Sequence, residues 1–317
     1  MVRKLILASI LLAATACSRH GSDRPVAEPR AVAPLYGYFA GYEPGAVVPD
    51  SLRPAMAAFM AVLGQPELSD SAIAAWAASA QVRVFTPDVD SVFPTLEPVE
   101  RSLGGVLARA AAEDIDFPHR SYAAVVWGRP QSIVFADSVM LIALNHYLGA
   151  DYPGYASLPA YARSVKTPTH LAQDIAEALT ATAYPRVAEA DATVLSRLLY
   201  EGALAEARVR LCGISDAEAL DYDAETYDEL LAHEAEIWQL LVGRGLLYST
   251  LPSDADRLVA PAPATAVLAS NLPGRVGRFL GLRIVRSYLK RNPETPLATL
   301  LSPGFYNSPD ALRESGY

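Results

Sequence analysis

The sequence has very few cysteines and histidines, the residues that form disulfides and that most often ligate transition metals. It contains two cysteines, Cys17 and Cys212, and five histidines in 317 residues. No two histidines stand in an H-x-H or H-x-x-x-H arrangement, the spacing that places two imidazoles on one face around a metal. A framework of several disulfides and a compact histidine metal site are both excluded, and we expect no cofactor.

Long apolar runs are also scarce. After residue 16 no uninterrupted apolar stretch reaches the roughly 18 residues of a spanning helix. The net charge is −9, and removing Arg3 and Lys4 with the leader described next makes it −11. This acidic balance argues against nucleic acid and against adsorption to anionic lipid headgroups. Half of the residues, 51%, are apolar, which is enough to build a large buried core.

The first sixteen residues, "MVRKLILASILLAATA", have the pattern of a secretory signal. Arg3 and Lys4 precede an apolar run, and small residues stand before the cleavage point. Cys17 follows directly, and this arrangement resembles the lipobox of bacterial lipoproteins, where the thiol is acylated, commonly with palmitate. We therefore expect residues 1–16 to be a lipoprotein signal peptide and Cys17 to carry the anchor; an ordinary secretory signal is the alternative. Each acyl methylene buried in a membrane contributes about 0.8 kcal/mol.

Residues 17–34 are polar and contain several prolines, which predicts a semi-extended tether after the lipidated cysteine. Ser18 and Arg19 follow Cys17, in place of the Asp that commonly retains lipoproteins at the inner membrane. We therefore expect the protein on the outer membrane, facing the periplasm. Residues 35–317 would then form one periplasmic domain.

The pattern over residues 35–317 is mainly helical, with a β-rich middle. Runs at 122–128 and 132–137 predict a hairpin, and 139–149 predicts a third strand that bends at Asn145. The fold class expected is α+β, a mostly α-helical single domain with a small central antiparallel sheet. The predicted helices cover residues 50–64, 69–82, 96–114, 168–185, 192–213, 223–245 and 273–295.

The stretch "LLAHEAEIWQL", residues 230–240, begins like the helix of a zinc protease. His233 and Glu234 are adjacent, but Ile237 stands where the second histidine ligand is needed. The stretch also has an apolar stripe that explains it as a core helix. We interpret it as structural. The stripe contains Leu230, Leu231, Ile237, Trp238 and Leu241.

Two charged segments have both a structural and a functional interpretation. The acidic run 221–229 lacks the Gly and the closing Glu of a calcium loop, so we interpret it as the start of a helix. Near the C-terminus, arginines three residues apart could share helix faces. Pairing with carboxylates of this acidic chain is the structural interpretation, and a site for an anion or a partner is the functional one. These arginines are Arg275, Arg278, Arg283 and Arg286.

Several longer segments carry a resemblance to a known family. They are "ALNHYLGADYPGY", "LLYEGALAEA", "EIWQLLVGRGLLYST", "NLPGRVGRFLGLRIVRSYLKRN" and the final "ALRESGY", in that order. Together they resemble the gliding-motility lipoprotein GldB family of Bacteroidota over residues 120–317. The resemblance implies a lipid-anchored, non-catalytic envelope protein that supports the gliding machinery or the associated protein secretion system. Its partners would be other proteins of those systems.

That family in turn resembles predicted zinc peptidases that carry an H-E-x-x-H helix before a similar C-terminal pattern. In "LSRLLYEGALAEA", Tyr200 stands at the first His, Glu201 keeps the Glu, and Leu204 occupies the second His position. The resemblance implies a degenerate zincin-like fold that binds no zinc. Two alternatives stay open: a zinc peptidase or other hydrolase with an unrecognised site that includes Glu201, and a lipoprotein that binds a small molecule.

Overall fold

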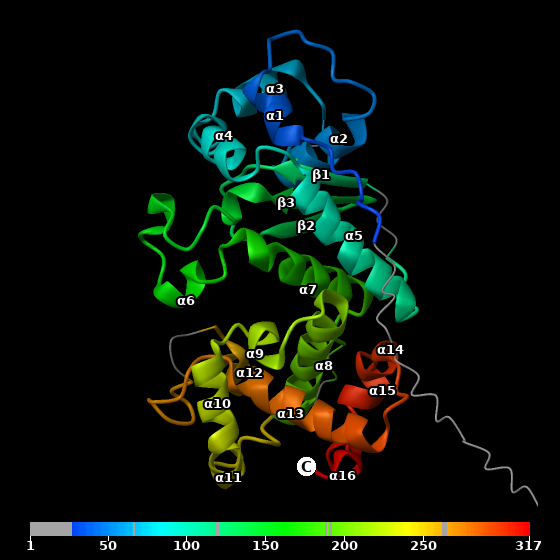
Figure 1. The fold of residues 1–317 in the computed structure, drawn as a ribbon, viewed down its shortest axis with the longest axis vertical. Coiled ribbons are helices and arrows are strands. Elements are labelled where there is room, and N and C mark those ends of the chain that lie inside the picture. The colour runs from blue at the N-terminus through cyan, green and yellow to red at the C-terminus, as the bar shows by residue number, and fades with distance from the viewer. Residues whose placement is uncertain (1–26, 66, 118–120, 188, 190–191, 262–264) are drawn as a thin grey trace, which may run out of the picture.

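The computed structural model describes residues 27–317 apart from residues 66, 118–120, 188, 190–191 and 262–264. The signal peptide at 1–16 and the acylation expected at Cys17 lie outside the described residues. A small sheet separates helices α1–α4 from a larger helical layer that contains α7, α8 and α13 (Figure 1). This architecture confirms a mostly helical α+β fold.

The sheet has three strands: β1 (Ser121–Val125), β2 (Ile133–Ala136) and β3 (Val139–Ala143). Their order is β1-β3-β2. The central position of β3 follows from its sequence, "VMLIA", in which all five residues are buried, as expected for a strand covered on both faces. The 3-10 turn η1 (Leu144–His146) follows β3 directly, which confirms the bend expected at Asn145.

The strand pairing differs from the expected hairpin. Strand β3 is antiparallel to β2 but parallel to β1, so the sheet is mixed. The hairpin predicted between 122–128 and 132–137 is wrong, because β1 and β2 lie on opposite sides of β3. The turn instead links β2 to β3 at Asp137, whose φ is 49°. Aspartate tolerates this left-handed conformation because its short side chain can bond locally.

Alternation along the strands divides the apolar residues into two cores. Ala123 and Leu141 face the N-terminal helices, whereas Ala124 and Met140 face the larger helical layer. Because successive side chains of a strand point to opposite faces, one short sheet serves both cores. The N-terminal helices are α1 (Leu35–Ala40), α2 (Arg53–Val62), α3 (Asp70–Ala77) and α4 (Ala80–Val92).

The single helix predicted over residues 69–82 is two helices in the structure. Ser79 has extended backbone angles, and its side chain accepts a hydrogen bond from the Val82 amide at 3.4 Å. The segment therefore contains a second N-cap, which starts α4 instead of continuing α3. Ser69 caps α3 by accepting a hydrogen bond from the Ala72 amide.

The larger layer is built around α8 (Val194–Cys212), which is buried along most of its length. Thr193 caps its N-terminus, and Gly213 ends it with a φ of 70°, which confirms the helix predicted over 192–213. Its main neighbours are α5 (Glu97–Ala112), α7 (Leu171–Ala183) and α13 (Val276–Arg291). The remaining helices are α6 (Ala160–Arg163), α9 (Asp216–Ala219), α10 (Ala224–Ala232), α11 (Glu234–Gly243), α12 (Pro252–Val259), α14 (Leu297–Leu300), α15 (Pro303–Tyr306), α16 (Ala311–Ser315), η2 (Pro153–Tyr155) and η3 (Pro168–His170).

Helices α8 and α13 touch through their backbones. A Cβ atom on Gly202 would lie 2.2 Å from the carbonyl carbon of Gly281, and a Cβ on Gly281 would lie 1.9 Å from the Leu198 oxygen. Distances below about 3 Å are incompatible with a side chain, so glycine is required on both helices. The figure shows α13 crossing α8 in the lower layer (Figure 1).

Residues 27–34, which the sequence assigned to the tether, lie against the folded domain. The Arg30 amide donates to the Glu100 carbonyl at 3.0 Å, and Ala33 forms a parallel bridge with Ala123. A Cβ on Gly104 would lie 2.1 Å from the Glu28 oxygen. Gly104, unfavourable for a helix by propensity, therefore lets the N-terminal segment approach α5.

The glycine contact predicts a contrast between three alanine substitutions. Gly202→Ala and Gly281→Ala should each lower the free energy of unfolding by about 1–3 kcal/mol, because the added methyl forces the helices apart. Gly243→Ala is the matched control, since a Cβ there meets nothing within 4 Å. Alanine favours helix over glycine, so the control should be neutral or slightly stabilising. Denaturant unfolding measures all three, and equal stability of the three variants would contradict the contact.

Candidate functional site: a buried ion-pair network

The crossing of α8 and α13 brings together candidate residues far apart in the sequence. Glu201 adjoins Gly202, and Arg278 lies one turn before Gly281. Their side chains form an ion pair, with Arg278 Nε 3.3 Å from Glu201 Oε2. The other oxygen of Glu201 accepts a hydrogen bond from Arg197 Nε at 2.8 Å. Each oxygen of Glu201 therefore has a guanidinium partner.

Tyr200 and Leu204, which the expected resemblance to zinc peptidases aligned with histidines, make other contacts. The Tyr200 hydroxyl donates to the Tyr184 carbonyl at 2.9 Å, and its ring packs edge-on against Tyr306. Burial, together with the charge of Glu201, raises the pKa of Tyr200 to about 12. Leu204 is buried in the main core. Over the described part of the chain, no group of three or more His, Cys, Asp or Glu side chains could hold a metal ion.

A second set of contacts extends from Arg278 toward Asp221. Glu177, on α7, accepts from Arg278 Nη2 at 3.0 Å and from Arg208 Nη1 at 3.1 Å. Arg208 Nη2 lies 2.6 Å from Asp221 Oδ1, and these side chains are only 2% and 4% exposed. Arg275 also pairs with Asp221. We call this set the central ion-pair network: Arg197, Glu201, Arg278, Glu177, Arg208, Asp221 and Arg275.

The arginines of the central ion-pair network keep its buried carboxylates ionised. Burial by itself would raise the pKa of Glu177, but the charges of Arg278 and Arg208 outweigh it and hold the pKa at about 2. Burial would also raise the pKa of Asp221, but the charges of Arg208 and Arg275 outweigh it and hold that pKa at about 2. Charges out of water are tolerable only when they are paired in this way. The network therefore joins α7, α8 and α13.

Asp221 and Arg275 meet through unusual backbone conformations. Their φ angles are 59° and 66°, in the left-handed region that non-glycine residues seldom adopt. Such residues persist where their surroundings compensate the strain, and here the compensation is the ion pair between them. Within the same acidic run, Asp223 accepts from the Thr226 amide at 2.7 Å and caps α10. This confirms the expected start of a helix, whereas the role of Asp221 was not foreseen.

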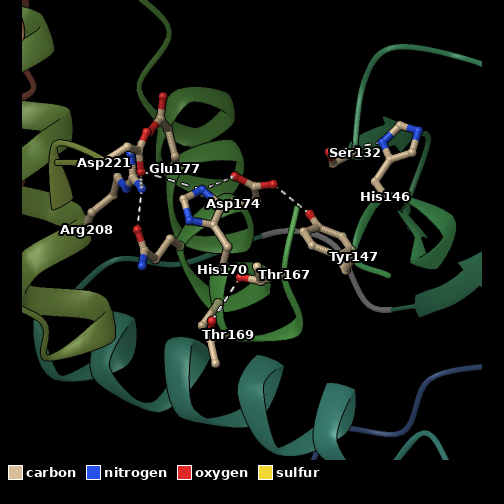
Figure 2. Close-up of polar contacts among 12 residues, drawn as sticks. Ser132, His146, Tyr147, Thr167, Thr169, His170, Asp174, Glu177, Arg208 and Asp221 are labelled. Atoms are coloured by element: carbon tan, nitrogen blue, oxygen red, sulfur yellow. Dashed lines mark hydrogen bonds and ion pairs between the residues drawn. The ribbon is translucent and has the colours of Figure 1, made fainter. Parts of the chain in front are cut away.

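The network continues to His170 and Asp174. Figure 2 shows Asp174 between His170 and Tyr147, with Arg208 on the other side of His170. His170 Nε2 lies 3.2 Å from Asp174 Oδ1, and the Tyr147 hydroxyl donates to Asp174 Oδ2 at 2.7 Å. The imidazole also lies 3.6 Å from Asp221 Oδ1. Hence His170 lies between two carboxylates and belongs to the same structural unit.

His146 and Cys212 occupy separate, local environments. His146 Nδ1 lies 3.1 Å from Ser132 Oγ, away from the central ion-pair network (Figure 2). Burial, reinforced by the charge of Lys166, lowers the pKa of His146 to about 4. The Cys212 thiol donates to the Ala172 carbonyl at 3.4 Å, and burial raises its pKa to about 11. Both groups are uncharged at neutral pH and partner neighbouring residues.

The two C-terminal arginines of the candidate set also pair with carboxylates. Arg283 Nε lies 2.8 Å from Glu234 Oε2. Arg286 Nη1 lies 3.1 Å from Glu206 Oε2, and its Nη2 lies 2.6 Å from Asp216 Oδ1. The four candidate arginines of α13 and its N-terminus thus follow the structural interpretation of the segment. They pair with six different carboxylates and do not converge on one anion site.

The helix predicted over 223–245 breaks at His233, and this part of the sequence interpretation is wrong. The backbone there leaves the helical conformation, with φ −109° and ψ 13°, so α10 ends and α11 begins. His233 is exposed. Glu234 instead holds Arg283, and Trp238 packs edge-on against Tyr317 with ring centres 5.0 Å apart. The His-Glu pair has no shared role, because only Glu234 faces a partner.

Sequence reasoning missed several members of the network, although one signal was present. Arg197, Glu201 and Arg208 stand four and seven residues apart on α8, a spacing that puts charges on one helical face. That face is otherwise rich in leucine and alanine, so buried pairing could have been inferred. Glu177 gave no local signal, because its partners Arg208 and Arg278 come from other elements, whereas His170 stands four residues before its partner Asp174.

The fold and its network describe a mostly helical α+β protein whose central helices are linked by buried ion pairs. The family model for the gliding motility protein GldB matches residues 48–317. The chain therefore belongs to this family, whose model begins well before the segments that carried the resemblance. No curated protein and no solved structure matches the chain. The resemblance to zinc peptidases has no support among these comparisons.

Breaking the central ion-pair network should be costly. Asp221→Asn keeps the size of the side chain and its tolerance of positive φ, but it removes the negative charge with which both Arg208 and Arg275 pair, leaving Arg208 only Glu177 as an ion-pair partner. We expect the free energy of unfolding to fall by about 3–5 kcal/mol, the usual effect of removing one member of a buried pair. Chemical denaturation at neutral pH measures the change.

Asp310→Asn is the matched control for this substitution. Asp310 pairs with Arg313 on the surface, where the side chains are 55% and 74% exposed. Exposed pairs contribute about 0–1 kcal/mol, so this variant should unfold close to the parent protein. If both variants lost equal stability, the central ion-pair network would not be the main electrostatic contribution to the free energy of unfolding.

Proposed function

We propose that the protein is a lipid-anchored, non-catalytic component of the cell envelope that supports gliding motility machinery or the associated protein secretion system. The match to the GldB family supports a gliding-associated lipoprotein. Among the described residues no helix is both long and apolar enough to cross a membrane, and a lipid at Cys17 would supply the attachment. Ser18 and Arg19 favour the outer membrane, on its periplasmic side.

One observation carries the non-catalytic part of the proposal. Glu201 stands where a zinc peptidase would place its general base, but its two oxygens pair with Arg197 and Arg278. A general base needs a free oxygen within hydrogen-bond reach of the proton that it accepts. Tyr200 and Leu204 flank it without offering a metal ligand. The arrangement suits a rigid core that displays surfaces to envelope proteins.

The anchor is tested at Cys17. Cells grown with an alkyne fatty acid should label the parent protein and leave Cys17→Ala unlabelled, because only the thiol can accept the diacylglyceryl group. The labelled protein should sediment with membranes and the variant should not. Cys212→Ala is the control, since that partly buried thiol lies in the folded domain and its loss should leave labelling unchanged. Equal labelling of Cys17→Ala and the parent would contradict the lipoprotein proposal.

The hydrolase alternative is tested by metal content. A zinc enzyme built around Glu201 should purify with nearly one zinc ion per chain, whereas we expect far less than one. Glu201→Gln should leave the trace metal content unchanged and lower the melting temperature, because Arg197 and Arg278 lose a charged partner. Stoichiometric zinc in the parent protein, lost on substituting Glu201 or Tyr200, would overturn the non-catalytic assignment.

A further inference from the structure

A large cavity lies between α5 and the C-terminal end of α8, outside the central ion-pair network. Its volume is about 630 Å³, within the range of roughly 300–1,000 Å³ typical of small-molecule sites. Gly105 and Gly213 line it, and because they have no side chains they leave its wall open. The other apolar lining residues are Ala27, Ala108, Ala112, Val209 and Ile214.

The charged side chains at this cavity already have protein partners. Arg109 Nη1 donates to the Leu211 carbonyl at 3.2 Å. Arg210 Nη1 pairs with Glu113 Oε2 at 3.0 Å, and its Nε donates to Glu206 at 2.7 Å. Long arginine stems present methylenes beside apolar surface while their heads remain bonded. The lining therefore favours an apolar occupant over a polar or charged one.

The N-terminal segment leads the chain to this cavity. The Val32 amide donates to Glu100 Oε1 at 3.1 Å, and the Glu28 oxygen lies at Gly104, one turn further along α5. The segment thus lies antiparallel to α5, so going back along it toward the N-terminus leads toward the C-terminal end of α5. Ala27, the next residue, lines the cavity. Ala27 is thus the first described residue after Cys17 in the sequence, and it lies at the cavity.

We propose that this cavity binds a fatty-acyl chain, and that its occupant is one of the acyl chains carried by Cys17 of the same molecule. The inference rests on the proposed lipid anchor. Ala27 stands ten positions after Cys17, and an extended chain over ten positions reaches at most about 33–36 Å. Because Ala27 itself lines the cavity, Cys17 is tied within this distance of it, and an acyl chain on Cys17 can fold back into the cavity.

The tether itself is a poorer occupant than the acyl chain. Residues 17–26, "CSRHGSDRPV", carry charged and hydroxyl groups, and their backbone amides would need partners that the cavity lining does not offer. An acyl chain brings only methylenes, and their removal from water is favourable. The other chains of the lipid would stay in the bilayer. The face formed by α5 and the end of α8 would then lie toward the membrane.

The test uses the full-length protein with a fatty acid that carries both a diazirine and an alkyne, fed to growing cells. After irradiation, peptides crosslinked to the acyl chain are captured through the alkyne and identified by mass spectrometry. We expect intramolecular crosslinks to peptides containing Ala108 or Val209. The yield of these crosslinks should fall at least fivefold in the double variant Gly105→Leu/Ala108→Leu, which fills the cavity.

The filled variant should fold, because a Cβ on Gly105 meets only Arg109 Nη1 at 3.5 Å, an ordinary contact. Its melting temperature is compared with that of Ala235→Leu, which adds one leucine at an exposed helical position outside the cavity and should keep the crosslinks. Two results would overturn the proposal while leaving the anchor intact. In the first, the acyl chain of the labelled protein crosslinks only to lipids. In the second, the filled variant gives the same yield of crosslinked peptides as the parent protein. Absence of label at Cys17 would overturn the anchor, and this inference with it.

Discussion

The backbone contact between α8 and α13 is the constraint on which the rest of the structure depends. Gly202 and Gly281 let the helices approach more closely than any side chain would allow. At this separation Glu201 and Arg278 come within bonding distance, and Glu177 reaches both Arg278 and Arg208. If the helices stood further apart, these buried charges would lose their partners, and unpaired buried charges are strongly destabilising.

The central ion-pair network occupies the position at which the resemblance to peptidases would place catalytic groups. Arginines partner Glu201 there, and the network continues through Asp221 and His170 to Asp174. Its charges largely neutralise one another inside the protein. Such a core is suited to holding a fixed shape, and a fixed shape is what a protein needs when its surface, and not a reactive group, performs its role.

The N-terminal segment connects this rigid core to the proposed membrane attachment. It is not a free linker up to residue 34, because residues 28–33 lie along α5 and add a bridge to the sheet. Gly104 permits this approach, and Glu100 bonds the segment through its carbonyl and its carboxylate. The described part of the segment begins at Ala27, beside the cavity of about 630 Å³ between α5 and α8.

The sequence by itself determined the helices with strong periodicity and clear termini, such as α5, α8 and α13. For the C-terminal arginines it left both carboxylate pairing and a site for an anion or a partner open. Periodicity and caps are local, so they can be read along the chain. Only the tertiary structure decided that β1 lies parallel to β3, that His233 interrupts a helix, and which carboxylate each arginine meets. Those outcomes depend on neighbours distant in sequence. The same holds for Gly104, Gly202 and Gly281, because a glycine's role in a close approach is defined by the backbone opposite it.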